Sequence, residues 1–144
     1  MQVCAYLNYD GQAEEAFQFY AGVLGGKLSD VFRFGAMPGQ GEQLPPALAN
    51  RVMHVTLHLP DGQVLMASDT MDGMGPPHQA GNNFSISIHP DSREHAEKLF
   101  AGLAEGGTVT MPLADQFWGD YFGSLVDRFG IQWMVNYNDQ GVGV

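Results

Sequence analysis

The sequence contains few basic residues and a single cysteine. Six Lys and Arg residues stand against sixteen Asp and Glu residues, which gives a formal net charge of −10. Proteins that bind DNA or RNA need a basic surface to replace the phosphate counterions, so we expect no nucleic-acid partner. One cysteine, Cys4, forms neither an internal disulfide nor a thiolate metal cluster.

Long apolar runs are also absent from the sequence, although 44% of its residues are hydrophobic. It has no stretch of about 18 apolar residues, the length that a membrane-spanning helix needs. It also has no basic flank followed by the apolar core of a signal peptide. We therefore expect a cytoplasmic protein that does not contact membranes. A chain of 144 residues is typical of one globular domain.

The chain contains an internal repeat. Residues 16–23 (AFQFYAGV) reappear 80 positions later as residues 96–103 (AEKLFAGL). Each segment leads to a glycine pair, Gly25-Gly26 in the first copy and Gly106-Gly107 in the second, where one residue is inserted. A repeat at a nearly fixed offset indicates two copies of one structural unit.

Each copy has the pattern of one strand, one helix and three further strands. Apolar residues recur at helical spacing over residues 12–24 and again up to about Glu105, and β-rich segments flank both helices. Asp10 and Asp91 precede the helices and are expected to cap them. The predicted strands are residues 3–9, 28–34, 52–59 and 63–68 in the first copy and residues 84–89, 108–112, 117–126 and 131–137 in the second.

This pattern predicts an α+β fold built from two tandem βαβββ modules. Module one covers residues 1–69, a linker covers 70–82, module two covers 83–138, and a loose tail covers 139–144. Two such modules can pair about a pseudo-twofold axis, so the space between them is the expected ligand site.

Short motifs occur in a fixed order along nearly the whole chain. They are YLNYDG (6–11), AF (16–17), FY (19–20), LGG (24–26), MH (53–54), LMASD (65–69), GGTV (106–109), FW (117–118) and DRFGIQWM (127–134). Their order and spacing resemble the PhnB-like branch of the vicinal oxygen chelate superfamily, which includes glyoxalase I, bleomycin-binding proteins and extradiol dioxygenases. The resemblance implies curved, incomplete barrel sheets with helices on the convex side, a ligand on the concave side, and a homodimer.

The resemblance also identifies the positions where metal enzymes of the superfamily hold their ion. Those enzymes place one His or Glu on the first strand and one on the last strand of each module, with a coordination position left for substrate. The matching residues are Ala5, Met66, Ser85 and Met134. None of these side chains binds Mg, Mn, Zn or Ni well, so we expect no metal at the usual place and no cofactor.

Other residues carry reactive groups. His54 and His58 share one strand face, but four residues at ~3.3 Å each separate them by about 13 Å, too far to chelate one ion easily. His54 and Asp69 are the catalytic candidates, with Asp69 expected as a lone carboxylate at the mouth of the cavity that would act as a general base if burial raised its pKa. Ser68 beside Asp69 lacks the glycine elbow of a hydrolase nucleophile, and a locally bonded strand-end hydroxyl is the more common interpretation.

Aromatic and sulfur-containing side chains predict an apolar pocket. Trp118 matches the Phe-Trp position of the PhnB-like branch and offers an N–H to a ligand, while methionines provide adaptable walls. Such a pocket suits a small organic molecule, although the same side chains would serve equally well to fill the core between the sheets. The predicted lining is Tyr6, His54, Met66, Ser68, Ser85, Trp118 and Met134.

Three functions are open at this point. The preferred one is binding or sequestration of a small, largely apolar molecule without the usual metal. The second is a lyase or isomerase that uses His54 and Asp69, with or without a non-standard metal site. The third is a structural or regulatory dimer whose cavity is filled by side chains. Proteins of this branch are often labelled 3-demethylubiquinone-9 3-methyltransferases, but the sequence has no strand, glycine-rich turn and helix start that would bind a methyl-donor nucleoside.

Overall fold

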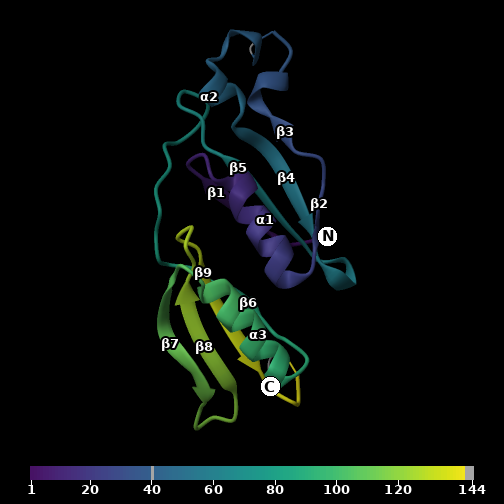
Figure 1. Cartoon of the computed structure of the whole chain (residues 1–144), viewed down its shortest axis with the longest axis vertical. Helices are drawn as coiled ribbons and strands as arrows, with labels where there is room; N and C mark the ends of the chain where they lie inside the picture. Colours follow the sequence, from purple (N-terminus) through teal and green to yellow (C-terminus); the bar gives the residue numbers. More distant parts are fainter. Residues whose placement is uncertain (40, 142–144) are drawn as a thin grey trace. The chain divides into compact units, whose positions relative to one another are not determined.

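The computed structural model describes residues 1–39 and 41–141, and it divides into two compact units (Figure 1). Unit 1 is Met1–Gln79 and unit 2 is Ala80–Val144, so the boundary falls inside the predicted linker. Each unit consists of one open sheet with one long helix on one of its faces. The α+β fold with two sheets is therefore confirmed.

Unit 1 has a sheet in the order β1-β5-β4-β2, with β3 also paired to β4. β1 runs parallel to β5, and the other pairs are antiparallel. The elements are β1 (Ala5–Tyr9), α1 (Ala13–Leu24), β2 (Lys27–Leu28), β3 (Phe32–Arg33), η1 (Phe34–Ala36), η2 (Gly41–Gln43), α2 (Pro46–Ala49), β4 (Val52–His58), η3 (Pro60–Gly62) and β5 (Val64–Asp69).

Unit 2 repeats this topology in the order β6-β9-β8-β7. Its first strand also runs parallel to its last strand, and the remaining pairs are antiparallel. The sequence repeat is therefore a repeat of structure. The elements are β6 (Ile86–Ile88), α3 (Arg93–Ala104), β7 (Thr108–Asp115), β8 (Tyr121–Val126) and β9 (Gln132–Tyr137).

The core of each unit lies between its helix and one face of its sheet. Strand side chains alternate between the two faces, and every second residue is buried along β5 and in the middle of β8 and β9. We call the face of each sheet opposite its long helix the open face. The buried core residues include Leu7, Tyr9, Ala13, Ala16, Phe17, Tyr20, Val55, Leu57, Leu65 and Ala67 in unit 1 and Ala96, Leu99, Phe100, Leu103, Leu125, Trp133 and Val135 in unit 2.

The two glycine pairs have the same structural role after the two helices. Gly25 and Gly106 have φ angles of 79° and 76°, the left-handed region that glycine enters cheaply. The next glycine in each pair packs against the neighbouring strand, β4 for Gly26 and β8 for Gly107. A Cβ on Gly26 would lie 2.7 Å from the carbonyl oxygen of His58, and one on Gly107 would clash with that of Val126.

Several predicted strand bounds were wrong. The strand expected at 28–34 is two short strands, because the Ser29 hydroxyl accepts the Thr56 N–H in place of a backbone carbonyl. The strand expected to end at Pro112 continues to Asp115, since β7 is an edge strand where a proline removes no required hydrogen bond. Residues 117–120 form a turn instead of strand.

Both predicted helix caps were also wrong. Asp10 makes an ion pair with Arg51 at 3.0 Å, and the residue before α1 is Gln12, which makes no side-chain cap bond. In unit 2 the cap is Ser92, whose hydroxyl oxygen accepts the His95 N–H at 3.1 Å. Helix α3 therefore starts one residue later than Asp91 would require. Of the predicted loose tail, residues 139–141 continue a turn from Asn138, and residues 142–144 lie outside the described residues.

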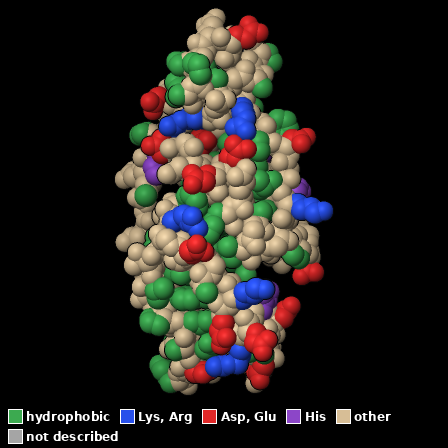
Figure 2. Space-filling model, in the orientation of Figure 1, with side chains coloured by type: hydrophobic (Ala, Val, Ile, Leu, Met, Phe, Trp, Pro, Cys, Tyr) green, Lys and Arg blue, Asp and Glu red, His purple; other side chains and the backbone are tan. Residues whose placement is uncertain are grey.

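The described helices are too short or too polar to cross a membrane. Figure 2 shows Lys and Arg side chains standing singly among Asp and Glu side chains on the visible face. That distribution agrees with the acidic composition of the chain.

Candidate functional site

The strand registers correct the alignment of the two units by one residue. Tyr6 pairs with Met66 in unit 1, and Ser87 pairs with Met134 in unit 2. The first strands are therefore related by an offset of 81, whereas the helices keep the offset of 80 that places buried Ala16 and Ala96 at equivalent positions. The connection from first strand to helix is one residue shorter in unit 2.

This shift changes which residues occupy the expected metal positions. Ala5 pairs with buried Leu65, so its side chain lies on the helix-covered face, and placing it in the ligand cavity was wrong. Tyr6 takes that place on the open face of unit 1. In unit 2 the corresponding residue is Ser87, because Ser85 precedes β6.

The residues on the open faces do not fit the metal of the superfamily. Tyr6, Ser87, Met66 and Met134 offer a phenol, a hydroxyl and two thioethers, which are poor ligands for the hard or borderline ions concerned. Within residues 1–39 and 41–141, no group of three or more His, Cys, Asp or Glu side chains is placed to hold a metal ion. No chemical step is therefore assigned to a metal.

The open face of unit 1 carries a hydrogen-bonded chain of three side chains. The Tyr6 hydroxyl lies 3.2 Å from Nδ1 of His54, and Nε2 of His54 lies 3.0 Å from the Thr56 hydroxyl. Both hydroxyls can donate or accept, so either neutral tautomer of His54 is satisfied. Tyr6 comes from β1 and the other two come from β4, on either side of β5.

Apolar side chains surround this polar chain. Met66 pairs in register with both Tyr6 and Thr56, so it lies between them on the open face. Phe32 pairs with His54 across β3 and β4 and is 53% exposed, and Tyr6 is 45% exposed. An imidazole and a phenol bordered by exposed apolar surface can bind a polar group on an apolar molecule.

The structure brings Tyr6, His54, Met66 and Ser68 together on the open face of unit 1. Ser68 pairs with Asn8 and follows Met66 by two residues on β5, so it shares the same face. The sequence analysis missed Thr56 and Phe32. The alternation of β4 places Thr56 on the same face as His54, but the contact of Phe32 depends on a register that the sequence does not reveal.

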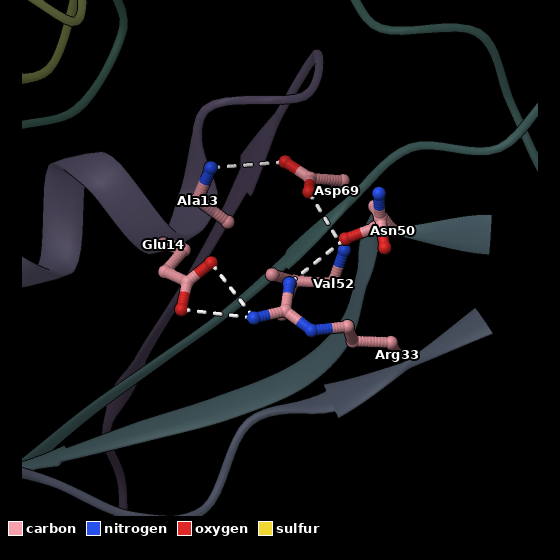
Figure 3. Close-up of polar contacts among 6 residues, drawn as sticks. All are labelled: Ala13, Glu14, Arg33, Asn50, Val52 and Asp69. Atoms are coloured by element: carbon pink, nitrogen blue, oxygen red, sulfur yellow. Dashed lines mark hydrogen bonds and ion pairs between the residues drawn. The ribbon is translucent and has the colours of Figure 1, made fainter. Parts of the chain in front are cut away.

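Asp69 lies on the other face of the same sheet and is 4% exposed. Its Oδ1 accepts the N–H group of Gly11 at 3.0 Å. Oδ1 also accepts the N–H of Ala13 at 2.9 Å, and Oδ2 accepts that of Val52 at 2.8 Å (Figure 3). Asp69 therefore joins the start of α1, the start of β4 and the end of β5. His54 and Asp69 lie on opposite faces of the sheet, and the geometry gives Asp69 a structural role.

Arg33 supports the same end of unit 1. Its Nη2 donates to both carboxylate oxygens of Glu14 at 3.0 Å, and its Nη1 donates to the carbonyl oxygen of Asn50 at 2.9 Å (Figure 3). The Arg33–Glu14 ion pair joins β3 to the first turn of α1, and the Asn50 bond joins β3 to the segment before β4.

The other predicted lining residues lie in unit 2. Trp118 is in the turn between β7 and β8 and is 52% exposed, with its ring against Phe117 and Phe122. Its Nε1–H donates to Oδ2 of Asp120 at 3.0 Å, so this N–H is already engaged by the protein. On the open face, the Ser87 hydroxyl lies 3.0 Å from Nε2 of His89.

Asp120 is held as an anion by its neighbours. The hydrogen bond from Asn138, at 2.6 Å, is the largest cause that lowers the pKa of Asp120, and bonds from Trp118 and Asn136 lower it further against the opposing effect of burial. The Asp120 carboxylate is therefore charged at neutral pH.

Comparison with known proteins gives the same fold and a family. The family model described as 3-demethylubiquinone-9 3-methyltransferase matches residues 1–136. Protein PA1353 from Pseudomonas aeruginosa is 40% identical, with a TM-score of 0.83 over 96% of this chain and 98% of that one. The PhnB protein from Bacillus cereus is 24% identical, with a TM-score of 0.75 over 95% and 99%. A glyoxylase/bleomycin resistance protein/dioxygenase domain from Frankia sp. EAN1pec is 16% identical, with a TM-score of 0.65 over 98% and 93%.

Proposed function

Because this chain belongs to the 3-demethylubiquinone-9 3-methyltransferase family, a PhnB-like group with the glyoxalase fold, we propose that it binds a small, largely apolar organic molecule on its open faces. Binding uses no metal at the usual positions of the superfamily. The observation that carries the proposal is the Tyr6–His54 pair, 3.2 Å apart, beside exposed Phe32 and half-buried Met66.

The ligand has a polar group attached to an apolar body. Its polar group exchanges hydrogen bonds with the Tyr6 hydroxyl or the His54 imidazole, and its body covers Phe32 and Met66. Covering exposed apolar surface contributes about 25 cal/mol for each Å² removed from water. The polar pair then fixes the orientation of the ligand, as a few polar groups do in an apolar pocket.

Methyl transfer is not the function we propose, despite the description of the family. In each sheet of the described chain, only the first and last strands run parallel. A doubly wound nucleotide-binding sheet instead needs adjacent parallel strands joined by helices, with the nucleotide at their carboxyl ends.

A lyase or isomerase is the second candidate, and the two hydroxyl partners of His54 favour it. An imidazole held between Tyr6 and Thr56 can move a proton to or from a bound substrate. In this alternative Tyr6, rather than Asp69, is the partner of His54. The homodimer and the filled-cavity alternative also remain proposals, and sedimentation of the purified chain tests the former.

Thermal-shift screening with small phenols and other aromatic molecules, followed by calorimetry, tests the binding proposal. Tyr6→Phe removes one neutral hydrogen bond and should weaken a bound phenol by roughly two- to tenfold. His54→Ala should weaken it at least as much. His58→Ala is the matched control, because His58 lies on the same strand and is exposed, and it should bind like the unmodified chain.

Two results would decide against this function. If a broad library of aromatic molecules gives no thermal shift, the filled-cavity alternative is favoured. If protein purified without a histidine tag contains stoichiometric Ni, Zn, Mn or Fe that His54→Ala loses, the metal-dependent enzyme is favoured instead.

A further inference from the structure

The hydrogen-bonded chain on the open face of unit 1 carries more polar hydrogens than it uses. Neutral Tyr6, His54 and Thr56 have one polar hydrogen each. The chain has two contacts, from Tyr6 to Nδ1 and from Thr56 to Nε2 of His54, and each contact uses one hydrogen. One hydroxyl hydrogen is therefore left over. Neither hydroxyl has another partner among the described residues, and the thioether of Met66 between them is only a weak acceptor.

The tautomer of His54 decides which end of the chain holds the spare hydrogen. When Nε2 is protonated, it donates to Thr56, Tyr6 donates to Nδ1, and the Thr56 hydroxyl hydrogen is spare. When Nδ1 is protonated, it donates to Tyr6, Thr56 donates to Nε2, and the Tyr6 hydroxyl hydrogen is spare. A doubly protonated His54 donates at both nitrogens and leaves both hydroxyl hydrogens spare. At least one spare hydrogen is thus present in either charge state of His54.

The neighbouring polar side chains do not take up this hydrogen. Ser68 shares the open face and makes no hydrogen bond to a described side chain, so it adds a hydroxyl hydrogen of its own. Asn8 pairs with Ser68 and is exposed, and its amide both donates and accepts. The Ser29 hydroxyl is already used, because it donates to the Asp30 carbonyl oxygen and accepts the Thr56 N–H. The face therefore offers hydroxyl hydrogens that need an acceptor.

A ligand that covers this face removes the spare hydrogen from water. Buried N–H groups without an acceptor are rarer in proteins than carbonyl oxygens with an unused lone pair, and a shielded hydroxyl hydrogen is unfavourable for the same reason. The ligand must therefore bring an acceptor, whereas a donor is optional. Tyr6 is 45% exposed and Thr56 is half-buried, so the ligand meets the Tyr6 end of the chain.

The charge of the protein favours an acceptor without a charge. The formal net charge is −10, which disfavours the approach of a carboxylate or another anion. Arg33, the residue after Phe32, already pairs with Glu14 at 3.0 Å and does not offset that field. A carbonyl oxygen is uncharged and accepts hydrogen bonds through two lone pairs.

We propose that the open face of unit 1 selects uncharged carbonyl compounds with an apolar body, whose carbonyl oxygen accepts the Tyr6 hydroxyl hydrogen. This selection rests on the function proposed above and defines the class of its ligand. Binding fixes the Nδ1–H tautomer of His54, in which Nε2 accepts the Thr56 hydroxyl hydrogen. Thr56 is a positioning residue, because it acts on the ligand only through His54.

Three bicyclic molecules of similar shape separate the ligand classes in NMR titrations of the ¹⁵N-labelled full chain. 1-Indanone has a carbonyl acceptor, indole has only an N–H donor, and indane has neither. 1-Indanone should bind more tightly than indole and more tightly than benzoate, an anionic acceptor. The ratio of 1-indanone affinity to indane affinity should fall roughly two- to tenfold in Tyr6→Phe. This ratio cancels differences in hydrophobicity between the two molecules.

Two substitutions of Thr56 test its positioning role. Thr56→Val keeps the shape of the side chain but removes the hydroxyl, so it should weaken 1-indanone roughly two- to tenfold and leave indane unchanged. Thr56→Ser should restore the affinity. Tyr121→Phe is the matched control, because it removes a hydroxyl in unit 2 that donates to Glu97, and it should bind every probe like the unmodified chain.

The imidazole ¹⁵N shifts of His54 give a readout that does not depend on affinity. In the complex with 1-indanone at pH 8, the Nδ1–H tautomer should predominate. The proposal is overturned if the Nε2–H tautomer predominates there, if Tyr6→Phe keeps the full preference for 1-indanone over indane, or if indole or benzoate binds at least as tightly as 1-indanone. Equal weakening of indane and 1-indanone by Thr56→Val would reduce Thr56 to a structural role. If none of the four molecules binds, this proposal and the proposed function fail together.

Discussion

Unit 1 and unit 2 have the same order of strands, yet each uses its buried aspartate in a different way. Asp69 accepts N–H groups from residues 58, 56 and 17 positions away in the sequence. Asp127 accepts those of Phe129 and Ile131 and the indole N–H of Trp133, all within six positions. A buried carboxylate thus joins distant segments in one unit and closes a hairpin turn in the other.

The open faces of the two units also carry different side chains at equivalent positions. In unit 1 His54 on β4 contacts Tyr6 on β1. In unit 2 the histidine is His89, just after the first strand, and it bonds Ser87 on that strand. Thr56 pairs with Met66 in unit 1, and Ser124 pairs with Met134 in unit 2, so Thr56 and Ser124 are equivalent. Two residues earlier on the same strands, Phe122 is therefore equivalent to His54. The repeat preserves the backbone pairing, whereas the chemistry of each open face is its own.

The largest expected effect is loss of the buried aspartates. Asp69→Ala should reduce the free energy of unfolding by about 3–5 kcal/mol, because it leaves amide N–H groups without a partner in a buried site. Asp127→Ala should cost a similar amount, and urea unfolding measures both. Hydrogen exchange should separate them, with faster exchange at the start of α1 only in Asp69→Ala. A cost below about 1 kcal/mol for either variant would contradict this comparison.

The glycines after the helices should give the next largest effect. Gly26→Ala and Gly107→Ala each push a Cβ into the neighbouring strand, β4 or β8, and overpacking of this kind costs about 1–3 kcal/mol. Gly22→Ala is the matched control, since nothing lies within 4 Å of its added Cβ and alanine favours helix by about 1 kcal/mol. Thermal unfolding should show a lower melting temperature for Gly26→Ala and Gly107→Ala and a higher one for Gly22→Ala. An unchanged melting temperature in Gly26→Ala or Gly107→Ala would mean that the two glycine pairs do not have the same role.

A smaller effect should separate the two helix starts. Ser92→Ala removes the hydroxyl that accepts the His95 N–H and should cost about 1 kcal/mol. Gln12→Ala should cost little, because Gln12 makes no cap bond and Asp69 accepts the Ala13 N–H instead. Chemical unfolding of the two variants checks the difference, and equal costs would mean that the helices start alike.

The smallest effect concerns pH. The pKa of Asp120 is lowered below its ordinary value of 3.8, so the folded state favours its charged form. Charged Asp120 therefore stabilises the folded state fully above pH 3.8. This stabilisation is lost as the pH falls through the lower pKa that Asp120 has in the folded protein. Asp120→Asn should therefore show a slightly flatter decline of stability below pH 3.8, measured by thermal unfolding. If stability falls equally with pH in Asp120→Asn and in the unmodified chain, Asp120 does not contribute to the loss of stability in acid.

The repeat made the fold predictable from the sequence. Helical periodicity and the glycine pairs located α1 and α3, and the β-rich segments at 52–59 and 63–68 located β4 and β5. Strand pairing was less accessible, because the helix motif fixed the offset at 80 while the shorter connection in unit 2 shifted its first strand by one residue. A shift of one residue exchanges the two faces of a strand, which is why Ala5 was misplaced.

The polar contacts of the site were predictable only in part. Met66 and Ser68 share a face because side chains alternate along one strand, whereas the face of His54 depends on the register of β4 with β5, which the loop between the two strands sets. The burial of Asp69 depends on backbone N–H groups up to 58 positions away, and the Trp118 N–H depends on a turn that brings Asp120 next to it. Contacts of both kinds follow from tertiary geometry, which residue spacing does not encode.

The long reach of Asp69 has a consequence for protein synthesis. The ribosome must add 56 residues after Ala13 before the carboxylate that accepts its N–H exists, which takes roughly 3–11 seconds at typical translation rates. Until then the first N–H groups of α1 can bond only water. The helix of the second unit has its hydroxyl partner within three residues, so its cap bond can form as soon as that helix is translated.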